Sequence, residues 1–213
     1  MNEVEFNKLS NDLRELVIRI PLGWGAVQNN GMDSLMTADS FFKISSYEEL
    51  EKSIASFPDA AKNYFRRRWY ILQCSRCDEY LFAINPGVTQ NPDPRDKSYD
   101  IAFGDYIKFD VKGTRIPNNM KRSEDSIAAV LSDPYGLVGF YYDQQSKGVR
   151  FDMQNRLFIV HHSFVDASRE LYLRCAWQTK REIYRVFSRN ISSINFINYK
   201  NCKAAVIFIV SIN

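Results

Sequence analysis

Two aspartates and a lysine near the middle of the chain have the types and spacing that suit metal-assisted chemistry. Asp100 precedes Asp110 by ten residues, and Lys112 follows Asp110 by two. Two carboxylates and a backbone carbonyl are suitable ligands for Mg²⁺, which keeps several waters in its shell. An ion held in this way polarises a phosphoryl oxygen, activates a water and neutralises a leaving oxygen. Lys112 would orient that water or stabilise the phosphorus centre, so the set predicts phosphodiester hydrolysis.

A β-hairpin is the element that must position these side chains. The segments SYDIAF and YIKFDVKG are rich in β-branched and aromatic residues and are separated by Gly104-Asp105. Because side chains alternate along a strand, Asp110 and Lys112 share a face, roughly 6.5–7 Å apart. Asp100 opens the first strand, and a modest shift or twist would bring its carboxylate beside Asp110.

A glutamate on a preceding helix completes the candidate site. Residues 58–84 contain no glycine and no proline after Pro58, which predicts one long helix. Its apolar stripe is formed by Phe65, Trp69, Leu72 and Ala83, and Glu79 lies on that stripe. The alternative is structural: an exposed hairpin with solvated charges, and a Glu79 that pairs with Arg76 one turn away.

These residues resemble the PD-(D/E)xK nuclease superfamily, which includes many restriction endonucleases and repair nucleases. The resemblance covers about residues 60–162 in element order and rests on Glu79, Asp100 and the triplet Asp110-Val111-Lys112. It implies a three-layer α/β/α sandwich with a central mixed sheet and Mg²⁺-dependent cleavage of DNA, with Mn²⁺ as a substitute, as in a restriction-type or mobile-element endonuclease. It also implies metal ligation by Asp100, Asp110, Val111 and Glu79, with Lys112 as the catalytic lysine.

The pattern leaves two points open. Asp93, in the dipeptide Pro92-Asp93, and Asp96 compete with Asp100 for the first ligand position, although only Asp100 adjoins a strand. The family core runs αβββαβ, and we find no clear first strand between Ala83 and Tyr99.

Residues after the triplet are candidates for contacts with DNA. Thr114 and Arg115 follow Gly113, and small then basic residues would let a phosphate approach and then hold it. Lys121-Arg122 would bind a duplex through its phosphates, which makes binding sensitive to salt.

The rest of the sequence predicts further helices and strands around this core. We expect helices over 4–18, 123–132, 134–146 and 164–189, and strands at RLFIVHH and KAAVIFIV. This order favours a single α/β domain with a mixed sheet between helices. Within it, residues 1–57 form a helical extension, 58–162 the candidate nuclease core, and 163–213 a helix and strand that complete the sheet.

Composition sets limits on function. The longest apolar run, about residues 204–211, is too short for a membrane span, and the N-terminus lacks a secretory signal, so we expect a cytoplasmic protein. Four scattered cysteines predict free thiols, with Cys74 and Cys77 buried in a helix. Residues 161–203 carry eight Lys/Arg against three Asp/Glu, which indicates a basic face.

A second function remains open at this stage. The same fold can act as a catalytically inactive nucleic-acid-binding or assembly protein, and a homodimer is compatible with symmetric double-strand cutting. His161 and His162, the only histidines, end a predicted strand, where one could contact a phosphate or transfer a proton. A packed structural role is the alternative for both.

Overall fold

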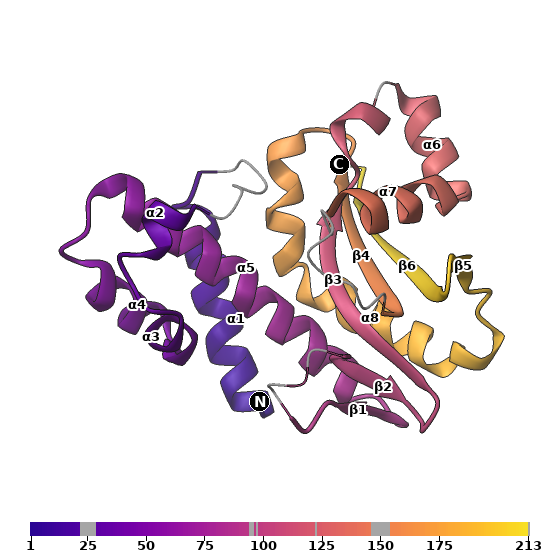
Figure 1. Ribbon diagram of the computed structural model, residues 1–213, viewed down its shortest axis with the longest axis horizontal. Helices are drawn as coiled ribbons and strands as arrows, with labels where there is room; N and C mark the ends of the chain where they lie inside the picture. The colour runs from indigo at the N-terminus through magenta and orange to yellow at the C-terminus, as the bar shows by residue number, and fades with distance from the viewer. Residues whose placement is uncertain (22–28, 94–95, 97, 122, 146–153, 213) are drawn as a thin grey trace.

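The computed structural model describes residues 1–21, 29–93, 96, 98–121, 123–145 and 154–212. It is a mixed α/β fold built on a six-stranded mixed sheet (Figure 1). The helices are α1 (Glu3–Val17), α2 (Asn30–Asp33), α3 (Ala38–Lys43), α4 (Tyr47–Ile54), α5 (Asp59–Ala83), α6 (Glu124–Ser132), α7 (Tyr135–Gln145) and α8 (Trp177–Arg189). The strands are β1 (Val88–Gln90), β2 (Ile101–Phe103), β3 (Ile107–Arg115), β4 (Arg156–Ser163), β5 (Ile197–Tyr199) and β6 (Cys202–Ser211).

The sheet has the order β1-β2-β3-β4-β6-β5 and changes direction at β3. Strands β1, β2 and β3 form an antiparallel meander, whereas β3, β4 and β6 run parallel and β5 returns antiparallel to β6. The first three residues of β3 pair with β2, and residues 110–115 pair with β4. Beyond residue 109, therefore, β2 no longer follows the edge of β3.

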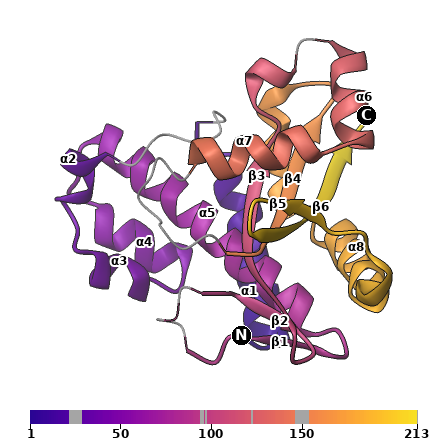
Figure 2. The same ribbon diagram turned by 45° about the vertical axis from the view of Figure 1, so that its right-hand side comes forward.

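Two apolar clusters cover the two faces of the sheet. Alternating residues of β3 and β4, such as Phe109 and Leu157, pack against helices α1, α5 and α8. The opposite face, which includes Phe158 and Val160, packs against α6 and α7. Figure 2 shows α7 across the sheet from the α1–α5 pair. Strand β4 is buried along its whole length, as expected for a strand with parallel neighbours on both sides.

Helix α5 ends close to the predicted residue because of the loop that follows it. The Asn85 side chain donates to the carbonyls of Leu81 and Phe82, and Gly87 adopts a left-handed φ of 78° that turns the chain into β1. This short strand supplies the element that sequence analysis does not find between Ala83 and Tyr99. Only three residues long, β1 carries little pattern of its own.

The predicted long helix over 164–189 is wrong in its first half. Two 3₁₀ segments, η2 (Ala167–Glu170) and η3 (Tyr172–Cys175), precede α8 instead. Asp166 caps η2 through the Ser168 N–H, and the chain leaves helical geometry at Ala176, where ψ is 56°. The tighter turns bring both Glu170 and Arg174 into the interior.

Two further expectations concern the membrane and the thiols. Among the described residues, no helix is both long and apolar enough to cross a membrane. All four cysteines are free and buried, and Cys74 and Cys77 lie within α5 as predicted.

Candidate active site

The candidate site lies where β2 separates from β3. Ile101 is paired with Phe109, and the Asp100 N–H also donates to the Phe109 carbonyl at 2.8 Å. Two residues of one strand thus oppose one residue of the other, as in a β-bulge, which bends the strand and re-aims a side chain. The Asp100 carboxylate accepts a hydrogen bond from the Val111 N–H at 2.7 Å. Asp100 therefore covers the edge of β3 that β2 has left.

Asp110 and Lys112 share a face of β3, as the strand alternation predicts. Lys112 Nζ lies 2.5 Å from Asp110 Oδ1. Asp110 is almost fully buried and is also paired with Arg156, whose Nε lies 3.4 Å from Asp110 Oδ2. Arg156 is the direct neighbour of Asp110 in the parallel β3–β4 register, and its guanidinium lies over the Tyr142 ring.

The two carboxylates interact with each other. Burial raises the pKa of Asp100, the charge of Lys112 lowers it, and the negative charge of Asp110 and a side-chain hydrogen bond with Asp110 raise it further. The pKa of Asp100 is therefore sensitive to the charge of Asp110. Like-charge repulsion of this kind favours a shared proton or a shared cation.

Glu79, on α5, lies close enough to Asp100 and Lys112 to interact with their charges. Burial raises the pKa of Glu79 to about 8, and the charges of Asp100 and Asp78 add to the shift. Arg76 and Lys112 act in the opposite direction. Arg76 donates instead to Gln73 and acts on Glu79 through its charge alone, so the alternative of a Glu79–Arg76 salt bridge is not realised among the described residues.

A cleft of about 750 Å³ opens beside Glu79 and Asp100. Its walls come from α1, the α3–α4 connection, α5 and the loop before β2; besides Glu79 and Asp100, the lining side chains include Lys8, Phe42, Gln73, Arg76, Asn91 and Tyr99. Helices α1 and α3, which belong to the N-terminal extension, therefore contribute to the surroundings of the candidate site.

The competing aspartates Asp93 and Asp96 lie in the loop before β2. Asp96 is exposed and accepts hydrogen bonds from Ser98 and Asn91. Asp93 is also exposed and, like Asp96, lines the cleft. Asp100 is the residue of the three whose pKa is raised by the charge of Asp110.

Some of the oxygen atoms at the site could bind a hard divalent cation. Asp110 Oδ2 is buried and accepts no hydrogen bond from the described residues. The N–H and C=O of a strand residue point to the same edge, so the Val111 carbonyl shares the Asp100 edge with its N–H. No group of three or more His, Cys, Asp or Glu side chains in the described chain is arranged to hold a metal. Two carboxylates and waters can still suffice for Mg²⁺.

The residues predicted to contact DNA lie in different surroundings. Thr114 is buried beside Tyr141, so its side chain is not on the surface. Lys121 and Arg115 instead converge on Glu170 at the carboxyl end of β3. Arg122 lies outside the described residues.

Both histidines are buried at the carboxyl end of β4, away from the carboxylate pair. His161 Nδ1 lies 3.0 Å from the Thr114 carbonyl, and burial lowers its pKa well below the usual value. His162 Nδ1 lies 3.2 Å from Glu170 Oε1.

Buried charges also change the reading of the basic segment 161–203. Arg174 and Lys180 are fully buried, and Lys180 pairs with Asp78 at 2.8 Å. Two of the eight cations therefore belong to the core, and the predicted basic face is smaller than the sequence indicates.

Sequence analysis misses Arg156 and Glu170 as members of these clusters. Arg156 opens a strand predicted correctly, but its pairing with Asp110 depends on the β3–β4 register, which carries no local signal. Glu170 falls within the helix that was wrongly predicted.

Comparison of the chain with protein-family models, with curated proteins and with solved structures found no match.

Proposed function

We propose that this protein is a Mg²⁺-dependent nuclease that hydrolyses DNA phosphodiester bonds, on a three-layer α/β/α fold similar to that of restriction endonucleases. The observation that carries the proposal is the convergence of Asp100, Asp110 and Lys112 where β2 leaves β3, with Glu79 near Asp100 and Lys112. The element order α5-β1-β2-β3-α6-α7-β4 supports it, because it corresponds to the αβββαβ order of that superfamily.

Each side chain has a distinct role in this proposal. Asp100, Asp110 and the Val111 carbonyl would hold Mg²⁺, with Mn²⁺ as a substitute, and Glu79 would assist from the helix. The bound ion would polarise the phosphoryl oxygen and lower the pKa of an attacking water. Lys112 donates to Asp110 in the resting protein, and on substrate binding it would turn to the water or to a non-bridging phosphate oxygen.

The carboxylates near Asp100 outnumber the cations that pair with them, which favours a bound cation there. Asp110 is matched by Lys112 and Arg156, whereas no ion pair is formed by Glu79 or Asp100 within the described residues. Both unpaired carboxyl groups have raised pKa values, because burial penalises their ionised forms. A divalent ion would remove that penalty.

The test is a cleavage assay with plasmid, single-stranded and branched DNA in Mg²⁺, Mn²⁺ or EDTA. We expect cleavage that requires the metal and falls at least 100-fold in Lys112→Ala and in Asp110→Asn, while DNA binding by Lys112→Ala persists. Lys203→Ala is the matched control, because Lys203 is an exposed lysine on β6 that lies outside the cleft lining. Equal activity of Lys112→Ala and the wild type would refute the catalytic role of the site.

The alternative is a nucleic-acid-binding or assembly protein without turnover. It is favoured by the double pairing of Asp110 with Lys112 and Arg156, which already neutralises that carboxylate. DNA binding by the wild type without cleavage under any metal condition would decide for this alternative.

A further inference from the structure

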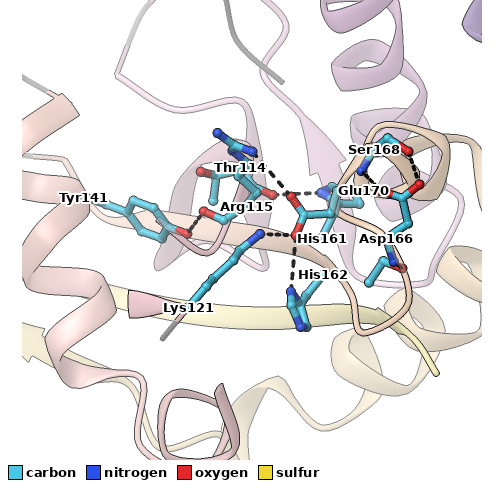
Figure 3. Close-up of polar contacts among 10 residues, drawn as sticks. Thr114, Arg115, Lys121, Tyr141, His161, His162, Asp166, Ser168 and Glu170 are labelled. Carbon is cyan, nitrogen blue, oxygen red and sulfur yellow. Dashed lines mark hydrogen bonds and ion pairs between the residues drawn. The ribbon is translucent and has the colours of Figure 1, made fainter. Parts of the chain in front are cut away.

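A buried carboxylate at the carboxyl end of β3 and β4 gathers three basic side chains (Figure 3). Glu170 is fully buried in η2. Its Oε1 accepts a hydrogen bond from Lys121 Nζ and lies 3.2 Å from His162 Nδ1, and its Oε2 lies 3.7 Å from Arg115 Nη1. The four residues come from β3, the segment after it, β4 and η2, so the cluster forms only in the folded chain.

Glu170 is placed to hold cations rather than to meet solvent. Burial alone would raise the pKa of Glu170, but hydrogen bonds from His162 and Lys121 and the charges of Lys121 and Arg115 outweigh it and lower the pKa. The group therefore stays ionised. A buried carboxylate is tolerated only when it is paired, so the geometry of Lys121 and Arg115 is tied to Glu170.

Cationic groups of the cluster reach the surface and outnumber the carboxylate. The side chain of Arg115 is 27% exposed and that of Lys121 13% exposed, whereas Glu170 is 0% exposed. The Arg115 guanidinium makes no hydrogen bond to any described residue, since its distance to Glu170 is that of an ion pair only. Its planar set of N–H donors is thus available, and that set matches a phosphate in a bidentate manner.

The cluster lies at the carboxyl end of β3, on the same strand as the candidate active site. Arg115 is five residues from Asp110 along β3, which corresponds to about 16 Å at ~3.3 Å per residue. Side chains alternate along a strand, so Arg115 leaves the opposite face of β3 from Asp110 and Lys112, and a DNA backbone would contact it at the carboxyl end of the sheet rather than over that face. Carboxyl ends of parallel strands are also a frequent place for ligands in open α/β sheets.

We infer that Arg115 and Lys121, positioned by Glu170, form a phosphate-binding site for the DNA backbone at a distance from the cleaved bond. The inference rests on the proposed function for its ligand. Arg115 and Lys121 would contact phosphate oxygens, and Glu170 is a positioning residue that never touches the DNA.

Salt-dependent binding tests the two cations. The probe is a fluorescein-labelled 30-base-pair duplex in EDTA, followed by anisotropy from 50 to 200 mM NaCl. Loss of one phosphate contact lowers the slope of log K against log salt by about 0.9. The advantage of the wild type over Arg115→Ala or Lys121→Ala should then shrink by about 3.5-fold across this range. Arg189→Ala is the control, because it removes an exposed charge at the end of α8. Its slope of log K against log salt should stay within about 0.3 of the wild-type slope, which corresponds to about one third of a phosphate contact.

Glu170→Gln tests whether Glu170 positions Arg115 and Lys121 or only changes the net charge of the protein. This change makes the protein more positive by one, so charge alone would tighten DNA binding. If Glu170 positions Arg115 and Lys121, binding should weaken by about three- to tenfold, the range of one or two phosphate contacts, despite the added positive charge. Circular dichroism melting shows whether Glu170→Gln is still folded. If it is not, the salt slope of Arg115→Ala, at a partly exposed position, is the test.

The outcomes distinguish this inference from the proposed function. Metal-dependent cleavage by the wild type together with an unchanged slope in Arg115→Ala and Lys121→Ala overturns the phosphate site and leaves the nuclease proposal intact. A reduced slope without any cleavage supports the phosphate site and refutes the nuclease. A wild-type protein that binds no DNA at 50 mM salt overturns the phosphate site as well.

Discussion

Replacing Glu79 by glutamine should change how stability depends on pH. In the folded protein the pKa of Glu79 is raised from 4.5 to about 8, mainly by burial. For a carboxyl group this means that the folded state holds the proton more tightly than the unfolded state. Between about pH 4.5 and 8 unfolding therefore releases a proton, and stability falls as the pH rises. Glu79 should lower the free energy of unfolding by at most about 1.4 kcal/mol per pH unit in this window.

The assay is urea unfolding of the wild type and Glu79→Gln at half-unit steps from pH 5 to 9. Other groups also titrate: the buried His161 has a lowered pKa, so its contribution is lost as the pH falls below about 6.5. Subtracting the two curves removes such shared effects. We expect the variant to gain stability relative to the wild type from pH 5 to 8, and to level off above pH 8.

A flat difference curve would refute the placement of Glu79 in a water-poor, negatively charged site. Glu15→Gln, at an exposed position of α1, is the control for the substitution itself. Addition of Mg²⁺ gives a second readout under the proposed function, because a bound cation favours the ionised carboxylate and should move the window to lower pH.

Two further predictions concern the packing behind the site. Gly113→Ala should destabilise the protein by about 1–3 kcal/mol in urea unfolding, because the added Cβ would lie 2.6 Å from the buried Arg174 guanidinium. Gly136→Ala is the control: it has open space around it and should not be destabilising. Lys180→Met should cost about 3–5 kcal/mol by leaving the Asp78 charge unpaired, and adding Asp78→Asn should restore part of that loss in a double-mutant cycle.

Local patterns predict much of the fold because they depend on neighbours in the chain. The long helix α5 follows from a run without glycine or proline, and the hairpin follows from two β-rich segments around Gly104, which has a φ of 58°. The shared face of Asp110 and Lys112 follows from strand alternation alone. Each of these inferences needs fewer than about 30 consecutive residues.

The features that sequence analysis misses depend on tertiary contacts. Polarity suggests an exposed helix over 164–189, yet Glu170 and Lys180 find buried partners of opposite charge. A partner of opposite charge that is distant in the sequence can stabilise a buried charge, and a hydropathy profile contains no information about such a partner. The β-bulge at Asp100 is likewise set by the pairing of β2 with β3, and its effect is to bring Asp100 to Asp110 without the loss of either strand.

Register between β3 and β4 links the candidate active site to the proposed phosphate site. Asp110 pairs with Arg156 at one end of the ladder, and Arg115 pairs with His161 at the other, next to the histidine that contacts Glu170. A slip of one residue would turn every side chain of β4 to the opposite face and would break both clusters together. The apolar alternation of β4, with Leu157 toward α5 and Phe158 toward α7, forbids that slip. The same packing that builds the core therefore fixes the separation of the two clusters along β3 and the faces on which Asp110 and Arg115 lie.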